Sequence, residues 1–319
     1  MNKLIRMLWK SDARLTAVGM LMIALLGVTG AALLVDPREI MGAPAWMKPA
    51  KFAASIAIYT LTLAWVFTYL RDFPRTRRVV SWVTTITLLI EIVIIDVQAW
   101  RGTTSHFNVG TVLDGVLFSI MGVAIMVQTA AAMAVAVALW KQPFSDRALG
   151  WALRIGMTVT IVGAMTGGLM ARPTRAQLDA ANAGNRMTIA GAHTVGAPDG
   201  GSGLPGTGWS REHGDLRVAH FLGLHALQVL PLLALGLARR GWQDIHRVRT
   251  VWAISGSYVS LFALLLWQAL RGQSVIAPDG TTALALVLWG ILTGWALWSA
   301  RSVPESARVH KLSAISSDS

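Results

Sequence analysis

The 319-residue chain contains no cysteine. A chain without cysteine cannot form a disulfide, attach a c-type haem covalently, or hold zinc or an iron–sulfur cluster through thiolates. Any metal must therefore be bound by histidine, carboxylate or methionine. Charged residues are also scarce, at 14% against 54% hydrophobic residues, and the mean hydropathy is +0.53. This composition is too apolar for a soluble domain of such length and indicates a protein of the lipid bilayer.

The net charge of +12 raises the question of a nucleic-acid partner. Nucleic-acid-binding proteins gather their basic residues on one face or along one helix. Here the basic residues fall in short segments between apolar runs. Their distribution indicates membrane topology and excludes nucleic acid as the expected partner.

The apolar runs predict an all-α, polytopic transmembrane helical bundle with about eight spans, because a hydrocarbon core needs about 20 apolar residues per helix. We expect one membrane domain over residues 1–319, with spans at 15–35, 49–70, 79–100, 112–140, 149–171, 218–238, 250–270 and 281–300.

The basic segments predict the orientation of these spans. They lie before the first span, after each even-numbered span, and after the last one. The positive-inside rule therefore places the N- and C-termini in the cytoplasm, and we expect a multi-pass protein of the cell inner (plasma) membrane. The longest connection, residues 172–217, would then lie outside. Its glycine and proline density predicts a flexible outer loop or lid without a core of its own.

Polar groups inside spans are costly and usually face a bundle interior or a cavity. The outer half of the predicted bundle collects many of them, which come from the second, third and sixth spans and the segment after the third: Lys48, Lys51, Glu91, Asp96, Arg101, His106, Arg217, His220, His225 and Gln228. Glu91 would lie about 14 Å from the outer end of its span and His225 about 10 Å from the start of its own. The sequence therefore predicts a single site opening to the outer side.

Each group also has a structural interpretation. Glutamines in spans commonly hydrogen-bond neighbouring helices, cations near the boundary reach towards headgroups, and Asp96 could pair with Arg101 or Lys51. His193 and His213 belong to the outer loop, where a surface role is the default. Glu91 is the hardest to explain structurally, so we predict Glu91 and Asp96 as the catalytic or protonatable carboxyls.

Three chemistries remain open. The leading hypothesis is a redox protein that binds b-type haem through His106 and His225, with His220 as the alternate ligand and quinone as a partner. Gln228 would line this site, and Arg101, Arg217, Lys48 and Lys51 would pair with an anionic group such as a haem propionate. The second is a metal-dependent membrane enzyme using the same histidines with Asp96 or Asp114.

The third hypothesis is a proton-coupled transporter or channel that uses Glu91. Transport sites favour spans that glycine or proline interrupts, and Pro231 and the glycines of the fifth span are such residues. The plan of spans resembles that of haem A synthases in number and size. Those enzymes place axial histidines in paired spans of both halves, whereas the eighth span here has none. The resemblance therefore implies no activity.

Overall fold

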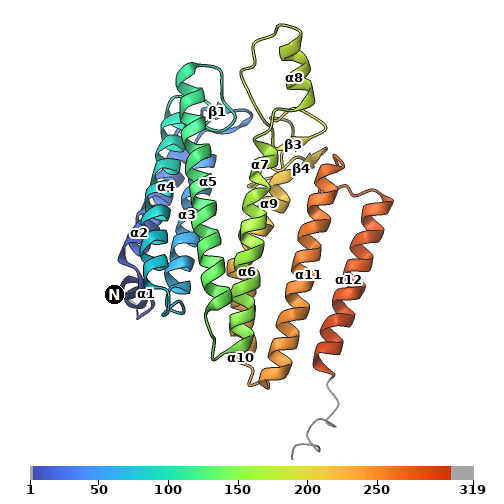
Figure 1. Cartoon of the computed structure of the whole chain (residues 1–319). Coiled ribbons are helices and arrows are strands. Elements are labelled where there is room, and N and C mark those ends of the chain that lie inside the picture. The colour runs from blue at the N-terminus through green and yellow to red at the C-terminus, as the bar shows by residue number, and fades with distance from the viewer. Residues whose placement is uncertain (1–2, 303–319) are drawn as a thin grey trace, which may run out of the picture.

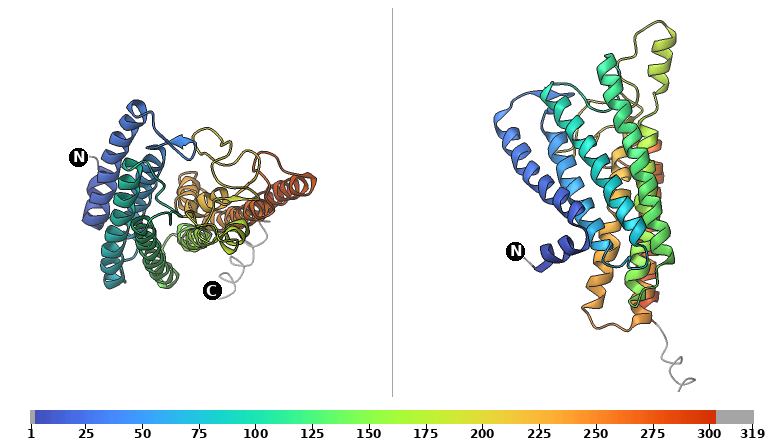
Figure 2. Two further views of the ribbon diagram at one scale, coloured as in Figure 1. Left: turned by 90° about the horizontal axis from the view of Figure 1, so that it is seen from above. Right: turned by 60° about the vertical axis from the view of Figure 1, so that its left-hand side comes forward.

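The computed structural model describes residues 3–302 and forms a bundle of nearly parallel helices in two halves (Figures 1 and 2). The first half contains α1 (Lys3–Ser11), α2 (Ala13–Val35), α3 (Met47–Val66), α4 (Pro74–Trp100) and α5 (Val112–Lys141). A small hairpin, β1 (Glu39–Ile40) and β2 (Ala43–Pro44), connects α2 to α3. Its turn uses Met41 and Gly42, both with positive φ, as the tightest hairpin turns require.

The second half begins with α6 (Arg147–Met165), which continues after a short break as α7 (Gly167–Met170). The long connection after α7 holds α8 (Arg175–Asn182) and the paired strands β3 (Thr194–Val195) and β4 (Gly214–Asp215). The remaining helices are α9 (Leu216–Leu224), α10 (Ala226–Ala238), α11 (Asp244–Leu270) and α12 (Gly280–Arg301). Seen from above, α12 lies at the edge of the bundle, against α11 (Figure 2).

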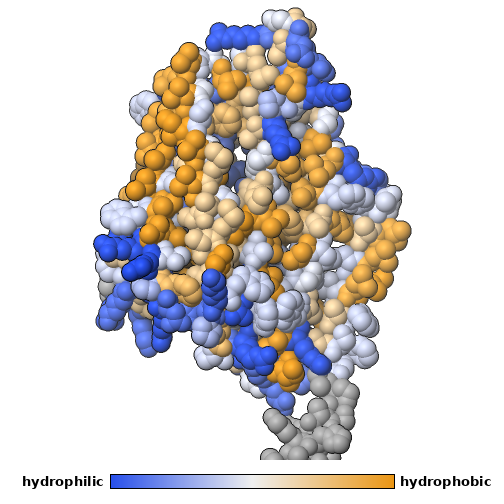
Figure 3. Space-filling view, viewed as in Figure 1, coloured by the Kyte–Doolittle hydropathy of each residue, from blue (hydrophilic) through white to orange (hydrophobic). Residues whose placement is uncertain are grey.

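The described residues contain seven helices that are long and apolar enough to cross a membrane, or up to eight if the bent pair α9–α10 counts as one span. The predicted all-α architecture and membrane character are thus confirmed. The outer surface of these helices is largely apolar, for example along α5 in Figure 3, as expected of helices that face lipid.

The two ends of the bundle differ in chemistry. One end, which we call the basic end, carries α1, the α3–α4, α5–α6 and α10–α11 connections and the end of α12 (Figure 1). Basic side chains cluster there, among them Arg75, Arg78, Arg239 and Arg240. The other end, which we call the loop end, carries the connections 101–111, 171–213 and 271–279.

The halves are joined mainly near the basic end. The largest core cluster lies there and takes buried side chains from both halves, including Leu63 of α3, Phe67 directly after α3, Leu139 of α5, and Leu227 and Leu230 of α10. Towards the loop end, in contrast, the buried clusters are smaller and separate. Figure 3 shows a narrow hollow there between the apolar face of α5 and the second half. The fold therefore leaves room for a site between the halves at the loop end.

The sixth predicted span is broken at His225, where α9 and α10 meet at 46°. A break inside a membrane is tolerated only if the freed backbone groups find partners. Thr160 of α6 supplies two of them, since its hydroxyl donates to the Leu224 carbonyl (3.3 Å) and accepts from the Leu227 amide (3.2 Å). The Tyr258 hydroxyl donates to the Leu222 carbonyl. Side chains of neighbouring helices thus hold the break open.

Glycines bring α6 close to this broken span. A Cβ on Gly163 would lie 2.5 Å from the Cα of Gly223. We expect Gly163→Ala to force the helices apart and to lower the melting temperature by several degrees, since overpacking costs about 1–3 kcal/mol. Gly236→Ala, which meets nothing within 4 Å in α10, is the matched control. Equal melting temperatures for the two variants in detergent would contradict this close packing.

Candidate functional site

The connection between α4 and α5 is held in one shape by polar contacts. Asp114, in the first turn of α5, accepts hydrogen bonds from the Gln98 amide (2.9 Å), the Arg101 guanidinium (2.7 Å) and the Thr111 hydroxyl (2.6 Å). Asn108 donates to the Thr103 hydroxyl (2.9 Å) and accepts from the Gly110 amide. These bonds tie the end of α4 to the start of α5 and fix the segment between them.

This segment turns His106 back into the bundle. Phe107 has a φ of 63°, a left-handed conformation that is unfavourable for a bulky residue, and its side chain is buried. Its carbonyl accepts from the Ala190 amide (2.7 Å), which pins the strained residue to the long connection. Strained residues persist where the surroundings over-determine them, commonly at functional sites.

His106 lies between a lysine and a glutamate. Its Nδ1 is 3.1 Å from the Lys48 Nζ, and its Nε2 is 3.3 Å from the Glu91 Oε1. Glu91 lies nine residues before Trp100, hence about 14 Å inside α4, with its side chain 2% exposed. An ammonium group can only donate, so Nδ1 of the neutral ring accepts from Lys48 and the ring proton on Nε2 faces Glu91. The three side chains form a continuous chain of polar groups into the bundle.

Two further histidines, His193 and His220 of the second half, lie close enough to His106 to influence it electrostatically. The His193 Nδ1 lies 2.7 Å from Asp199 Oδ2, and the His220 Nδ1 lies 2.8 Å from the Gly163 carbonyl oxygen and 3.1 Å from the Thr166 hydroxyl. Carboxylates and carbonyls only accept, so both rings carry their proton on Nδ1 and turn an Nε2 lone pair away from these partners. Neither Nε2 has a hydrogen-bond partner among residues 3–302.

Lys48, His106, His193 and His220 lie close enough together to influence one another electrostatically, and we call the space among them the loop-end recess. The side chains of His106 and His193 are 23% and 26% exposed. Burial nevertheless lowers the pKa of His193, and burial, together with the positive charge of Lys48, holds the pKa of His106 well below its usual range. Both rings are therefore partly accessible to water although protein surrounds most of each of them. Phe52, Phe107 and Phe118 contact the His106 ring and form its apolar wall.

The lowered pKa of His106 predicts a loss of stability in acid. Below about pH 6.5 the unfolded chain protonates this histidine while the folded protein does not, so the free energy of unfolding falls as the pH drops towards the folded-state pKa. We expect a lower melting temperature at pH 5.5 than at pH 7.5 and a clearly smaller decrease in His106→Gln, which cannot titrate. A decrease of the same size in both proteins, measured in one detergent, would show that His106 is not responsible.

Several predicted charge partners already serve structural bonds. Arg101 pairs with Asp114, and the Lys51 Nζ donates to the Thr207 carbonyl (2.7 Å). Arg217 pairs with Asp215 (2.6 Å) but remains close enough to His193 for its charge to lower the pKa of that ring. Of the four predicted cations, Lys48 is the one that directly contacts His106.

The predicted ligand pair His106 and His225 is not brought together by any contact among residues 3–302. His225 lies at the α9–α10 break, where its ring packs on Phe221 at 4.3 Å between centroids. Gln228 follows one turn later, 3.3 Å from the Thr62 hydroxyl of α3. Asp96 lies five residues after Glu91, about 140° around α4, and its Oδ1 is buried without a partner in this part of the chain.

No group of three or more histidine, aspartate or glutamate side chains within residues 3–302 could hold a metal ion. The metal set expected from His106, His225 or His220 with Asp96 or Asp114 is therefore not assembled here.

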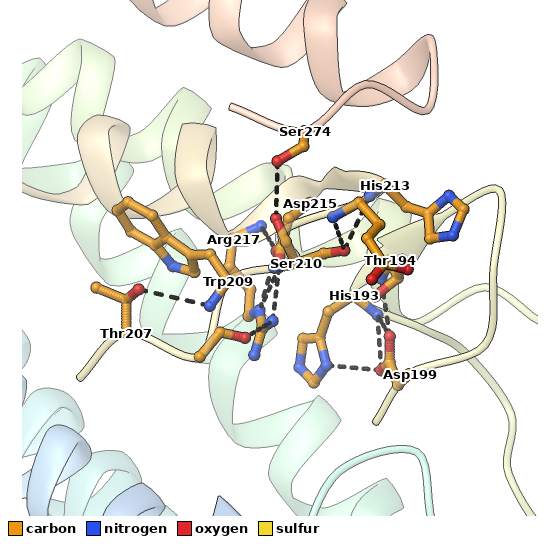
Figure 4. Close-up of polar contacts among 12 residues, drawn as sticks. His193, Thr194, Asp199, Thr207, Trp209, Ser210, His213, Asp215, Arg217 and Ser274 are labelled. Carbon is orange, nitrogen blue, oxygen red and sulfur yellow. Dashed lines mark hydrogen bonds and ion pairs between the residues drawn. The ribbon is translucent and has the colours of Figure 1, made fainter. Parts of the chain in front are cut away.

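The long connection 172–217, expected to be flexible, folds over the loop end around two carboxylates, the partly buried Asp199 and the buried Asp215 (Figure 4). Asp199 accepts from the His193 and Thr194 amides and from the His193 ring. These bonds and the His193 ring keep the pKa of Asp199 below its usual range, although burial alone would raise it. Asp215 accepts from the Ser210 amide (2.8 Å) and from three nitrogens of Arg217. The connection 172–217, which we call the strap, is fixed by these bonds and positions His193.

The sequence pattern did not predict that His193 and Asp199 belong to the site. Both lie in the glycine-rich connection, where no span places them at a depth. The available signal was local: Asp199 follows His193 by six residues across Gly196 and Pro198, so that a turn can return the carboxylate to the ring.

Fold and site together define a multi-pass helical membrane protein with a polar recess between two halves of its bundle. Comparisons of the chain with protein-family models, curated proteins and solved structures found no match.

Proposed function

We propose that this chain spans the cell inner (plasma) membrane eight times, counting α9–α10 as one broken span, with both termini in the cytoplasm. The concentration of arginine and lysine at the basic end supports this orientation. The loop end and its recess would then face the outside. The orientation makes the recess a site for a solute that arrives from the exterior.

The absence of native cysteine makes this topology directly testable. We expect Ser202→Cys, in the exposed part of the 171–213 connection, to react with a membrane-impermeant maleimide in intact cells. Ser145→Cys, exposed in the α5–α6 connection, should react only after the cells are opened. Labelling of Ser145→Cys in intact cells would show that the orientation is the opposite of the proposed one.

We further propose that the protein is a proton-coupled transporter. The observation that carries the proposal is the chain Lys48–His106–Glu91, which links the loop-end recess to a carboxyl buried in α4. A neutral imidazole can take a proton on Nδ1 and release the one on Nε2, so His106 can pass a proton between the recess and Glu91. Carboxyls deep in membrane spans commonly serve such relays.

The break between α9 and α10 supports the same function. Transport sites are commonly built beside interrupted spans, whose parts can move relative to each other. His220 lies on α9, five residues before the break, and the Gly163–Gly223 contact provides a close crossing point with α6. A change of angle at His225 would move His220 relative to His106.

The experiment is solute uptake by the purified protein in proteoliposomes that contain a pH-sensitive dye. A panel of small charged and polar solutes is added outside, at equal pH on both sides. The proposal expects at least one solute to cause a change of internal pH that empty liposomes do not show. Uptake of solutes without any movement of protons would contradict it.

The second candidate is a redox protein that holds b-type haem and reacts with a quinol. His193 and His220 support it better than the predicted pair does, because each has Nδ1 held by an acceptor and Nε2 free, as metal-binding histidines usually do. A Soret band in the purified protein that disappears in His193→Ala would favour this candidate. A colourless purified protein would exclude this candidate function.

A further inference from the structure

The loop-end recess offers three groups with definite hydrogen-bonding roles. Lys48 has three donor hydrogens, of which its bond to His106 uses one. The Nε2 atoms of His193 and His220 are acceptors, because Asp199 and the Gly163 carbonyl hold the proton of each ring on Nδ1. The recess therefore presents one positive charge and two neutral acceptors.

We propose that the transported solute is a small carboxylate that also carries a hydroxyl or amino group. This inference rests on the proposed transport function and names the class of its substrate. The carboxylate binds Lys48, and the hydroxyl or amino group donates to Nε2 of His193, the acceptor whose ring lies close enough to Lys48 to feel its charge. The phenylalanine wall formed by Phe52 and Phe107 covers the carbon skeleton.

Electrostatics favour this ligand over a bare metal ion, which two imidazoles could also attract. Burial lowers the pKa of the His193 ring, and the positive charges of Arg217 and Lys48 act in the same direction, whereas the carboxylate of Asp199 opposes them. The two cations also repel a divalent metal ion. No third histidine or carboxylate among residues 3–302 completes a metal site. An anion with donor groups meets the opposite situation, because the cation attracts it and the acceptors satisfy its donors.

The position of Lys48 also connects ligand binding to the proton relay. Its ammonium contacts His106, whose other nitrogen faces Glu91. A carboxylate that draws the ammonium towards itself weakens the bond to Nδ1 and leaves this nitrogen free to accept a proton. Arrival of the solute and protonation of His106 are thereby coupled through one side chain.

The test measures binding by thermal stabilisation and calorimetry of the purified full chain, with three matched probes of the same carbon skeleton: lactate, propionate and lactamide. Larger sets of up to six carbons are built in the same way. We expect, in at least one set, the hydroxy acid to bind about tenfold more tightly than both the acid without the hydroxyl and the amide. If no set shows this selectivity, the inference is wrong.

Substitutions in the recess test which residues cause the preference for the acid and for the hydroxyl. Lys48→Met should remove the preference for the acid over the amide, and His193→Ala the preference for the hydroxyl. His213→Ala, a histidine of the same connection that contacts neither Lys48 nor the His193 ring, should keep both preferences. Preferences that persist in Lys48→Met and His193→Ala overturn the proposal, as does haem or metal bound stoichiometrically to His193 and His220. Proton-coupled uptake of a solute without a carboxylate would refute the substrate class alone, whereas selective binding without proton movement would refute the transport proposal alone.

Discussion

Glu91→Gln is expected to abolish proton-coupled uptake, with a loss of about 100-fold or more and an intact fold. Glutamine has nearly the shape of glutamate but cannot take up or release a proton, and positioned acid–base groups contribute about 10²–10⁴-fold. The Glu91 Oε2 has no hydrogen-bond partner among residues 3–302, so the amide loses few contacts there. The measurement is the solute-dependent change of internal pH in proteoliposomes.

Asp96→Asn is the matched control for this substitution. Asp96 lies in the same helix and is also a carboxyl of the loop-end half, but no contact within the described chain joins it to His106. We expect this variant to retain uptake. Equal losses in both variants would mean that the helix tolerates no amide there, and unchanged uptake in Glu91→Gln would exclude Glu91 from the mechanism.

Asp215→Ala is expected to cause the largest loss of stability. Asp215 is 2% exposed and accepts bonds from the Ser210 amide and from Arg217. Removing one partner of a buried ion pair costs about 3–5 kcal/mol, and we expect the lower end because Arg217 is partly exposed. Without this anchor the strap that positions His193 should open, and limited proteolysis should cut the 171–213 connection.

Asp179→Ala provides the comparison, because Asp179 lies on the exposed side of α8 in the same connection. We expect it to leave the melting temperature and the proteolysis pattern almost unchanged. If Asp215→Ala is as stable and as resistant as Asp179→Ala, the carboxylate is not the anchor of the strap.

The helical architecture could be predicted from the sequence because the bilayer imposes it. Long apolar runs must form helices of a fixed minimum length, and the predicted runs agree with the helices within a few residues at most boundaries: 112–140 against Val112–Lys141, and 281–300 against Gly280–Arg301. The break at His225 was not predicted. It depends on Thr160 and Tyr258 of neighbouring helices, which no local pattern in residues 216–238 reveals.

The candidate site could be predicted only in part. The depth of Glu91 followed from its position in an apolar run, and its contact with Lys48 and His106 required the segment 101–111 to turn back into the bundle. That turn depends on the positive φ of Phe107 and on a bond to Ala190, more than 80 residues away in sequence. His193 enters the site through the strap, for which periodicity gives no signal. Conversely, the sequence predicts Arg101 and Lys51 as charge partners of an anionic ligand, but in the structure Arg101 pairs with Asp114 and Lys51 donates to the Thr207 carbonyl.

The proposed transport depends on the exchange of protons between Glu91 and His106. Infrared difference spectroscopy of the reconstituted protein during a pH titration measures this directly, through the carbonyl band of a protonated carboxylic acid. We expect a band that titrates in the wild type, is absent in Glu91→Gln, and has a shifted midpoint in His106→Gln. A spectrum that is identical in the wild type and Glu91→Gln, or a midpoint that His106→Gln leaves unchanged, would show that Glu91 and His106 do not exchange protons.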